Sequence, residues 1–229
     1  AYFNQHSNNA YDKAIDAAKN AIKQNSNYAE AYYSRGMAYY KAGKLPDAIN
    51  DMNKAVSLNN NNGQWYYNLA KCLDDKMDYT NAYNAYSSVL KTDTLHTLPD
   101  ALYYRGRSGY AAQNYTDALS DYLQCTSSGL DSVSVSFNNE MGNIYLNLGK
   151  YDSAIVWYQK QLSKDAGNGY AMYGIASSSF LKGNTSEALG WFEKSFQTKA
   201  VSGAEIKKDK HIANLRNEKS FKALLKKYY

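Results

Sequence analysis

Apolar and polar residues alternate with the period of an α-helix over most of the chain. Two segments show this most clearly: AYYSRGMAYYKAGKLPDAINDMNKAVSLNN at residues 31–60 and NNEMGNIYLNLGKYDSAIVWYQKQL at residues 138–162. In each, apolar residues stand at i, i+3, i+4 and i+7 on both sides of a glycine, Gly43 or Gly149, which tolerates a left-handed turn. The pattern predicts two amphipathic helices joined by a short turn.

This helix–turn–helix pattern repeats along the chain. Each unit carries an alanine three positions after a Tyr, Leu or Thr. These alanines are Ala14, Ala48, Ala82, Ala118, Ala154 and Ala188, and successive ones are 34, 34, 36, 36 and 34 residues apart. Small residues stand twelve positions before the last five: Gly36, Ala70, Gly106, Gly142 and Ala176. Four positions after each alanine stand Ala18, Met52, Tyr86, Tyr122, Tyr158 and Phe192. We interpret the small residues as close helix contacts beside which these larger side chains pack, and Asn9 as a turn residue like Gly43, Gly149 and Gly183.

The spacing and the small-residue, alanine and aromatic positions resemble the tetratricopeptide repeat, a 34-residue helix–turn–helix. The resemblance implies an all-α fold, a right-handed α-solenoid of tandem repeats over residues 1–202. It divides that array into a partial unit at 1–28 and units at about 29–62, 63–98, 99–134, 135–168 and 169–202. Two-residue insertions are expected between units, around residues 95–98 and 127–133, and Arg35 and Arg105 replace an expected leucine.

The last segment departs from the repeat and predicts a C-terminal cap at residues 203–229. Ser202 and Glu205 form a capping-box pattern, and apolar residues from Ile206 to Tyr228 predict short helices near 203–209 and 211–216 and a longer one near 218–228. A solenoid needs such a cap over its last open repeat. The segment is similar to the closing segment of many bacterial tetratricopeptide proteins, so we expect the natural C-terminus here.

The charge of the chain is unevenly distributed. The net charge is +5, yet residues 1–198 hold 17 Lys and Arg against 18 Asp and Glu, whereas residues 199–229 hold 9 against 3. Nucleic-acid binders usually spread cations over a docking face, so no nucleic acid is expected as the main partner. The composition, 44% hydrophobic and 21% charged, excludes a disordered chain. No stretch approaches the roughly 20 apolar residues of a membrane-spanning helix.

Candidate chemistry is sparse. His6, His96 and His211 have no metal-ligand spacing, and we interpret Cys72 and Cys125 as small core residues. The acidic residues Asp74, Asp75 and Asp78 lack the spacing of a calcium loop and are expected at a solvated helix end. No catalytic or phosphate-binding motif is present, so we expect neither an enzyme nor a cofactor.

The resemblance implies a ligand groove on the first helix of each repeat. The positions that face ligands in the family lie on one helical stripe around the small landmark residue. The predicted peptide-binding residues are Tyr33, Met37, Tyr40, Tyr67, Lys71, Tyr103, Arg107, Tyr110, Asn139, Asn143 and Tyr173. Tyrosine suits recognition surfaces because it offers a large rigid ring and a hydroxyl at low entropic cost. The alternative is that several tyrosines pack between adjacent first helices.

One family function is disfavoured by the residues themselves. Members that grip the carboxylate of chaperone tails place Lys and Asn on the first unit, Asn on the second, and Lys and Arg on the third. Those positions here hold Tyr33 and Met37, then Asn68, then Asp100 and Tyr104. One match in five predicts no chaperone-tail carboxylate clamp.

The leading prediction is a non-catalytic protein–protein interaction scaffold that binds a peptide or protein segment in the concave groove. The alternatives are a self-associating assembly subunit and a basic C-terminal tail that contacts anionic lipid or nucleic acid. No address signal stands at the first residues, so we expect the sequence to begin inside a longer or processed protein, and the compartment is not predicted.

Overall fold

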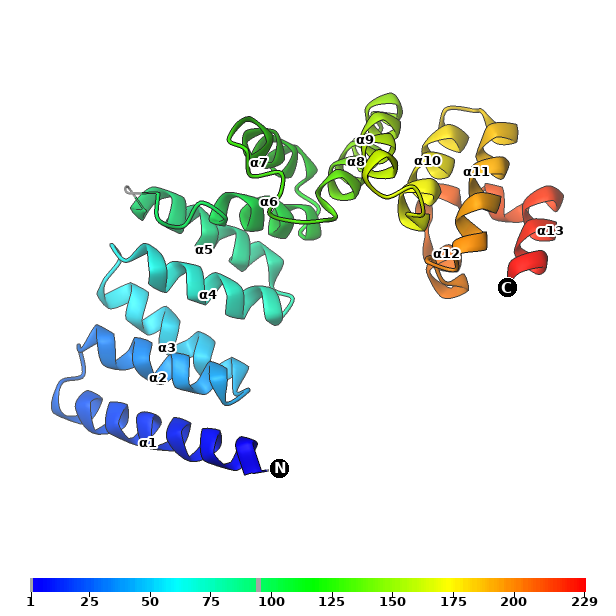
Figure 1. Ribbon diagram of the computed structural model, residues 1–229. Coiled ribbons are helices and arrows are strands. Elements are labelled where there is room, and N and C mark those ends of the chain that lie inside the picture. Colours follow the sequence, from blue (N-terminus) through cyan, green and yellow to red (C-terminus); the bar gives the residue numbers. More distant parts are fainter. Residues whose placement is uncertain (1, 94–95) are drawn as a thin grey trace. The chain divides into compact units, whose positions relative to one another are not determined.

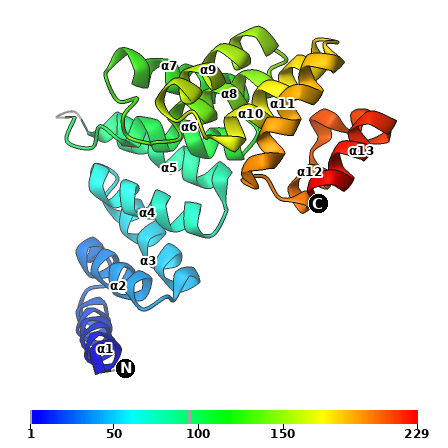
Figure 2. The ribbon, with the colours of Figure 1, turned by 45° about the vertical axis from the view of Figure 1, so that its right-hand side comes forward.

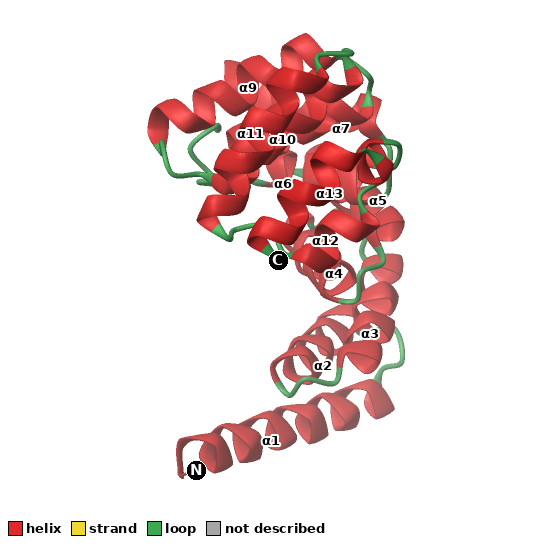
Figure 3. Cartoon of the chain, turned by 90° about the vertical axis from the view of Figure 1, so that its right-hand side faces the viewer, coloured by secondary structure: helices red, strands yellow, loops and turns green. Residues whose placement is uncertain are grey.

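The computed structural model describes residues 2–93 and 96–229, with side chains from residue 10 onward. Over these ranges the chain forms thirteen α-helices and two short 3-10 helices, and it forms no strand. Figure 3 shows helices and connecting loops alone. The predicted fold class is confirmed: an all-α array of tandem helix–turn–helix repeats. The insertion expected around residues 95–98 lies partly outside the described residues.

The chain divides into two compact units, residues 1–121 and 122–229, and α7 runs across the boundary. In the first unit α2 and α3 pack as an antiparallel pair, as do α4 and α5, and the turn between the two helices of a pair is short (Figures 1 and 2). The helices of this unit are α1 (Tyr2–Gln24), α2 (Ala29–Lys41), α3 (Leu45–Leu58), α4 (Gly63–Asp75), α5 (Tyr79–Thr92), α6 (Ala101–Ala111) and α7 (Tyr115–Ser127).

The second unit continues with helix pairs and then a segment of different character. Its elements are α8 (Phe137–Asn147), α9 (Tyr151–Lys164), α10 (Gly169–Leu181), α11 (Thr185–Thr198), α12 (Gly203–Lys208), η1 (Lys210–Ile212), η2 (Leu215–Asn217) and α13 (Lys219–Tyr228). The Ser202–Glu205 capping box is confirmed at the start of α12. The expectation of a short helix near 211–216 is wrong, because the chain forms two separate 3-10 helices there, η1 and η2. Ile206, Ile212, Leu215 and Phe221 are fully buried with Phe192 and Phe196 of α11. The division between array and cap at residue 202 stays a prediction.

The interpretation of small residues as close helix contacts is confirmed in both units. A Cβ atom on Gly36 would lie 3.0 Å from Met52 Cγ. A Cβ atom on Gly142 would lie 2.5 Å from Tyr158 Cε1, and one on Gly174 would lie 2.3 Å from Tyr158 Cζ. The Tyr158 ring therefore fills the space between α8 and α10, and it is 1% exposed.

The turns inside repeats use a left-handed residue five positions before the repeat alanine. Gly43, Gly149 and Gly183 have φ of 74°, 71° and 91° there, and Met77 and Gln113 occupy the equivalent turns with φ of 63° and 65°. The interpretation of Asn9 as a turn residue is wrong, because α1 continues through it from Tyr2 to Gln24 (Figure 1). Asparagine costs only a fraction of a kcal/mol, about 0.5, in a helix interior, so it does not end one by itself.

Candidate functional site

The predicted groove residues of the first unit lie on α2, α4 and α6, the first helices of three successive repeats. We call Tyr33, Met37, Tyr40, Tyr67, Lys71, Tyr103, Arg107 and Tyr110 the first-helix stripe. Its members differ in exposure: Lys71 and Arg107 are exposed, Tyr67 and Tyr103 are buried, and the others are half-buried. The stripe is therefore neither a continuous exposed surface nor entirely core.

Tyr33 of α2 is held against α4 by two contacts. Its ring stacks on Trp65 with centroids 5.0 Å apart and an interplanar angle of 15°. Its hydroxyl accepts a hydrogen bond from Asn68 Nδ2 at 2.6 Å. Asn68 is the one residue that matches the carboxylate-clamp pattern, and its side-chain amide donates a hydrogen bond within the chain.

Tyr67 of α4 makes the equivalent link to the next repeat. Its hydroxyl donates to Asp100 Oδ2 at 2.7 Å, directly before α6. Its ring packs edge-on against Tyr86 and Tyr104, and burial raises the pKa of Tyr67. Tyr67 is 9% exposed and Tyr103 is 3% exposed, which leaves little of either side chain for a ligand.

Tyr40 repeats the arrangement at the other end of α2. Its hydroxyl donates to Asp75 Oδ2 at 2.7 Å, and this bond to a carboxylate is the main reason that the pKa of Tyr40 rises to about 12. Met37, one turn earlier, packs half-buried against the same core. Tyr110 of α6 lies with its ring 5.6 Å from that of Tyr115.

Lys71 and Arg107 are the cations of the stripe. Lys71 Nζ lies 5.9 Å from the centroid of the Tyr67 ring, and the Arg107 guanidinium lies 5.1 Å from that of Tyr104. Arg107 Nη2 is also 3.7 Å from Asp74 Oδ2, while its side chain stays 49% exposed. Both cations therefore stand over aromatic rings at the surface, where such contacts contribute about 0.5–1 kcal/mol.

Asp74 corrects one sequence-based interpretation. It was expected at a solvated helix end, yet its side chain is 9% exposed and accepts from Ser108 Oγ at 2.7 Å and from the Tyr86 hydroxyl at 3.3 Å. Burial raises the pKa of Asp74. Its partners come from α5 and α6, because position 74 falls on the inward side of α4. The helical period could have revealed this, since Asp74 occupies the same repeat position as Tyr40 and Tyr110.

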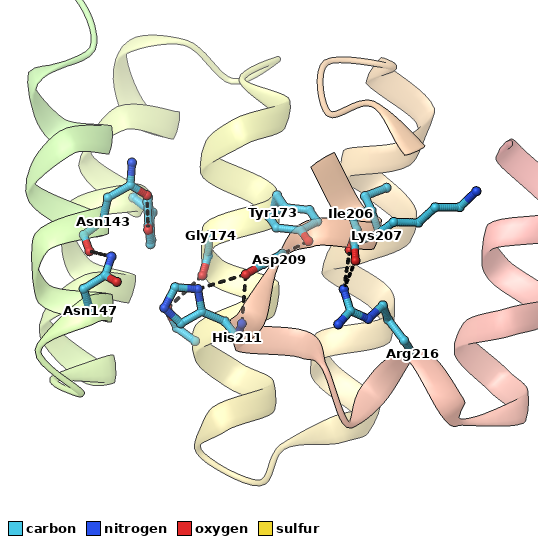
Figure 4. Close-up of polar contacts among 11 residues, drawn as sticks. Asn143, Asn147, Tyr173, Gly174, Ile206, Lys207, Asp209, His211 and Arg216 are labelled. Atoms are coloured by element: carbon cyan, nitrogen blue, oxygen red, sulfur yellow. Dashed lines mark hydrogen bonds and ion pairs between the residues drawn. The ribbon is translucent and has the colours of Figure 1, made fainter. Parts of the chain in front are cut away.

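The remaining predicted residues, Asn139, Asn143 and Tyr173, lie in the second unit. Some of their polar atoms form hydrogen bonds within that unit. Asn143 Oδ1 accepts from the Tyr158 hydroxyl at 2.7 Å, and Asn139 Nδ2 donates to Asn168 Oδ1 at 3.1 Å. Tyr173 of α10 donates to Asp209 Oδ2 at 2.9 Å (Figure 4). Its ring packs edge-on against Phe192, with centroids 5.2 Å apart.

Asp209 connects the terminal segment to the last repeat. Besides Tyr173, it accepts from the backbone N–H of His211 and lies 2.9 Å from His211 Nδ1 (Figure 4). Arg216 then donates to the carbonyl oxygens of Ile206 and Lys207 at the end of α12. Sequence reasoning missed Asp209. The available signal was its distance from Tyr173, about one repeat length.

Arg35 and Arg105, which stand where a leucine is expected, each form an ion pair with an aspartate. Arg35 Nε and Nη2 lie 2.6 and 2.7 Å from the two carboxylate oxygens of Asp51. Arg105 pairs in the same bidentate way with Asp121, which is 2% exposed. In both repeats the arginine and the aspartate are sixteen residues apart, so each pair clamps the first helix of a repeat to the second.

The two cysteines are core residues. Cys72 and Cys125 are buried as expected, and burial raises the pKa of the Cys72 thiol to about 12. Over the described part of the chain, no three His, Cys, Asp or Glu side chains are grouped to hold a metal ion. No helix there is both long and apolar enough to cross a bilayer.

Comparison with known families decides the identity of the repeat. Family models described as tetratricopeptide repeat match residues 29–62, 67–124 and 135–166, which together make up more than half of the sequence. The chain belongs to the tetratricopeptide repeat family. No curated protein matches it in sequence.

Solved structures agree on the fold. The tetratricopeptide protein YrrB, described as having an unusual peptide-binding site, superposes with a TM-score of 0.67 at 20% identity, over 85% of this chain and 98% of that one. A MamA structure gives 0.64 at 23% identity, over 75% and 91%. MamA from Desulfovibrio magneticus RS-1 gives 0.63 at 18% identity, over 75% and 94%. At these identities the likeness supports the tetratricopeptide fold alone.

Proposed function

We propose that this tetratricopeptide protein is a non-catalytic interaction scaffold and that it binds an extended protein segment along the first-helix stripe. The observation that carries the proposal is the placement of Lys71 and Arg107. They are the exposed residues of a stripe whose aromatic rings are fixed by hydrogen bonds from one repeat to the next. A surface that is rigid before binding loses little side-chain entropy when a ligand arrives.

The chemistry of the stripe selects the partner segment. Lys71 and Arg107 stand one repeat apart and both offer N–H donors, so the segment is expected to carry an acidic side chain or a terminal carboxylate. Asp74 already neutralises part of the charge on Arg107, which makes Lys71 the stronger attractant. The half-buried Met37, Tyr33 and Tyr40 provide apolar area beside it. A neighbour in fold, YrrB, is itself described as a peptide binder, which is consistent with this use of the fold.

The test is selection from a displayed library of random peptides. Wild-type protein should enrich peptides rich in Asp or Glu, and the variant Lys71→Glu/Arg107→Glu should lose that enrichment. The matched control is Lys54→Glu/Lys91→Glu, which makes the same charge change at exposed positions on the second helices α3 and α5 of the same unit. Enrichment that survives in the stripe variant, or that disappears equally in the control, contradicts the proposal.

The buried tyrosines are poor targets for this purpose. Substituting Tyr67 or Tyr103 would disturb inter-repeat packing, so a loss of binding would not identify a contact residue. Charge reversal at exposed side chains avoids that ambiguity.

A further inference from the structure

A cavity of about 420 Å³ lies in the second unit. Its walls are the connection before α8 and the end of α9 with the residues that follow it, and they include Asp131, Val135, Gln161, Lys164, Asp165 and Asn168. The connection, residues 128–136, overlaps the second two-residue insertion, between Ala118 and Ala154, which are 36 residues apart. The extra residues therefore build a wall that a standard repeat lacks.

Gln161 is the unusual residue of this cavity. It is 5% exposed, and its Oε1 has no hydrogen-bond partner among the described residues. The same repeat position holds Ala21, Ala55, Val89, Cys125 and Ser195 in the other units, all small or apolar. A buried carbonyl oxygen without a hydrogen-bond donor destabilises the fold, so a glutamine at this position is unfavourable unless a ligand supplies the donor.

A second acceptor stands next to the cavity. Asn139 donates through Nδ2 to Asn168, which lines the wall, while Asn139 Oδ1 is buried without a partner among the described residues. The Asp165 carboxylate accepts from Gly167 N at 3.1 Å and from Asn168 Nδ2 at 3.0 Å, which fixes it at the wall. Asp131 adds a second carboxylate, and the cation of the wall, Lys164, is exposed.

The unpartnered oxygens of Gln161 and Asn139 and the carboxylates of Asp131 and Asp165 are all hydrogen-bond acceptors, so they favour a ligand that donates hydrogen bonds and carries positive charge. A guanidinium group has five N–H donors in a plane and no acceptor, and it is more weakly hydrated than an ammonium. Val135, 92% exposed at the wall, can cover the apolar stem of an arginine side chain. We propose that the cavity between residues 131–136 and the end of α9 binds the guanidinium group of an arginine presented by a partner protein.

The binding test uses the full chain and two matched probes, N-acetyl-arginine amide and N-acetyl-citrulline amide, followed by NMR of the glutamine and asparagine side-chain amides. The arginine probe should shift the Gln161 amide signals and bind at least about tenfold more tightly than citrulline, which keeps the shape but lacks the charge. Equal binding of the two probes, or no response of Gln161 to either, overturns the proposal.

Variants separate the site from general surface effects. Gln161→Leu should weaken arginine binding at least about tenfold, whereas Gln161→Glu should strengthen it by adding charge at the same place. Gln159→Leu, an exposed position on the same helix, should leave affinity unchanged. Wild-type affinity in Gln161→Leu contradicts the proposal, and if that variant fails to fold, weaker binding by Gln161→Glu does so. Because the cavity lies in residues 131–168, the Lys71→Glu/Arg107→Glu variant should keep arginine binding, which makes this test independent of the proposed groove.

Discussion

Tyrosine hydroxyls in this protein mainly join one repeat to the next. Tyr33, Tyr40, Tyr67 and Tyr173 each bond to a residue 33 to 36 positions further along the chain, one repeat away. A phenylalanine at these positions would keep the ring contact but lose the bond that sets the register. These bonds assign an inter-repeat role to four of the 24 tyrosines. The alternative considered from the sequence, tyrosines packed between first helices, describes Tyr67, which contacts Tyr104 of α6.

The close contact at Gly142 gives a prediction at the residue scale. Gly142→Ala should lower the free energy of unfolding by about 1–3 kcal/mol, because the added Cβ would overlap the buried Tyr158 ring between two helices. Gly190→Ala in α11 is the control, since a Cβ atom there meets nothing within 4 Å. That control should gain roughly 0.5–1 kcal/mol, as alanine favours a helix over glycine. Urea denaturation followed by circular dichroism measures both, and equal effects would refute the steric account.

At the scale of elements, the sequence predicted the helix pairs well because their apolar period is uninterrupted within each helix. The same pattern located α12 and α13, and Ser202 and Glu205 marked the start of α12, but it did not show that residues 211–216 form two separate 3-10 helices instead of one short helix. It could not identify the left-handed turns at Met77 and Gln113, because neither side chain favours that conformation and only their alignment with Gly43 reveals it. It also could not show that Asp74 is buried, because a charged residue near a helix end usually faces solvent.

The turn at Met77 gives a prediction at the element scale. Met77→Gly should raise the free energy of unfolding by about 0.5–1 kcal/mol. The substitution removes the cost of a left-handed non-glycine residue, about 1–2 kcal/mol, but part of this gain is offset because glycine increases the conformational entropy of the unfolded chain. Met77 is 74% exposed, so little packing is lost. Gly43→Ala, the reverse change in the equivalent turn, should destabilise by about 1 kcal/mol. Thermal denaturation of both variants checks the pair, and a destabilised Met77→Gly would contradict the turn assignment.

The candidate site was predictable only as a stripe. The helical period placed the eleven predicted residues on first helices, but it did not reveal which of their polar atoms form hydrogen bonds within the chain. Tyr67 and Tyr103 turned out buried because a first helix packs against its neighbours on both sides, whereas Lys71 and Arg107 keep exposed ends on long side chains. The tertiary packing of the repeats decides which of these polar atoms find partners within the chain.

For the whole molecule, the buried hydroxyls predict alkaline unfolding. Burial raises the pKa of Tyr67, Tyr86 and Tyr173, and the bond to Asp75 raises that of Tyr40 to about 12. A raised pKa means that the folded state favours the neutral phenol. This contribution to stability is complete below the unfolded value of about 10 and is lost as the pH rises through 12.

The measurement is a pH titration that records helical circular dichroism and tyrosinate absorbance together. A late group of tyrosines should ionise only as helicity is lost, above pH 10. Tyr40→Phe removes one such group and should make the remaining helicity less sensitive to alkali, whereas Tyr28→Phe, at a 45% exposed position, should not. Ionisation of all tyrosines before any loss of helicity would contradict the buried network.

The central claim for the whole molecule is that a partner segment lies along α2, α4 and α6. Its most direct test is photocrosslinking from a benzophenone amino acid placed at Lys71, on the stripe, or at Lys54, on the second helix α3, in the presence of a peptide selected from the library. The account predicts crosslinks from position 71 that the unlabelled peptide competes away, and none from position 54. Crosslinks from position 54 alone, or equal crosslinks from both, would contradict it.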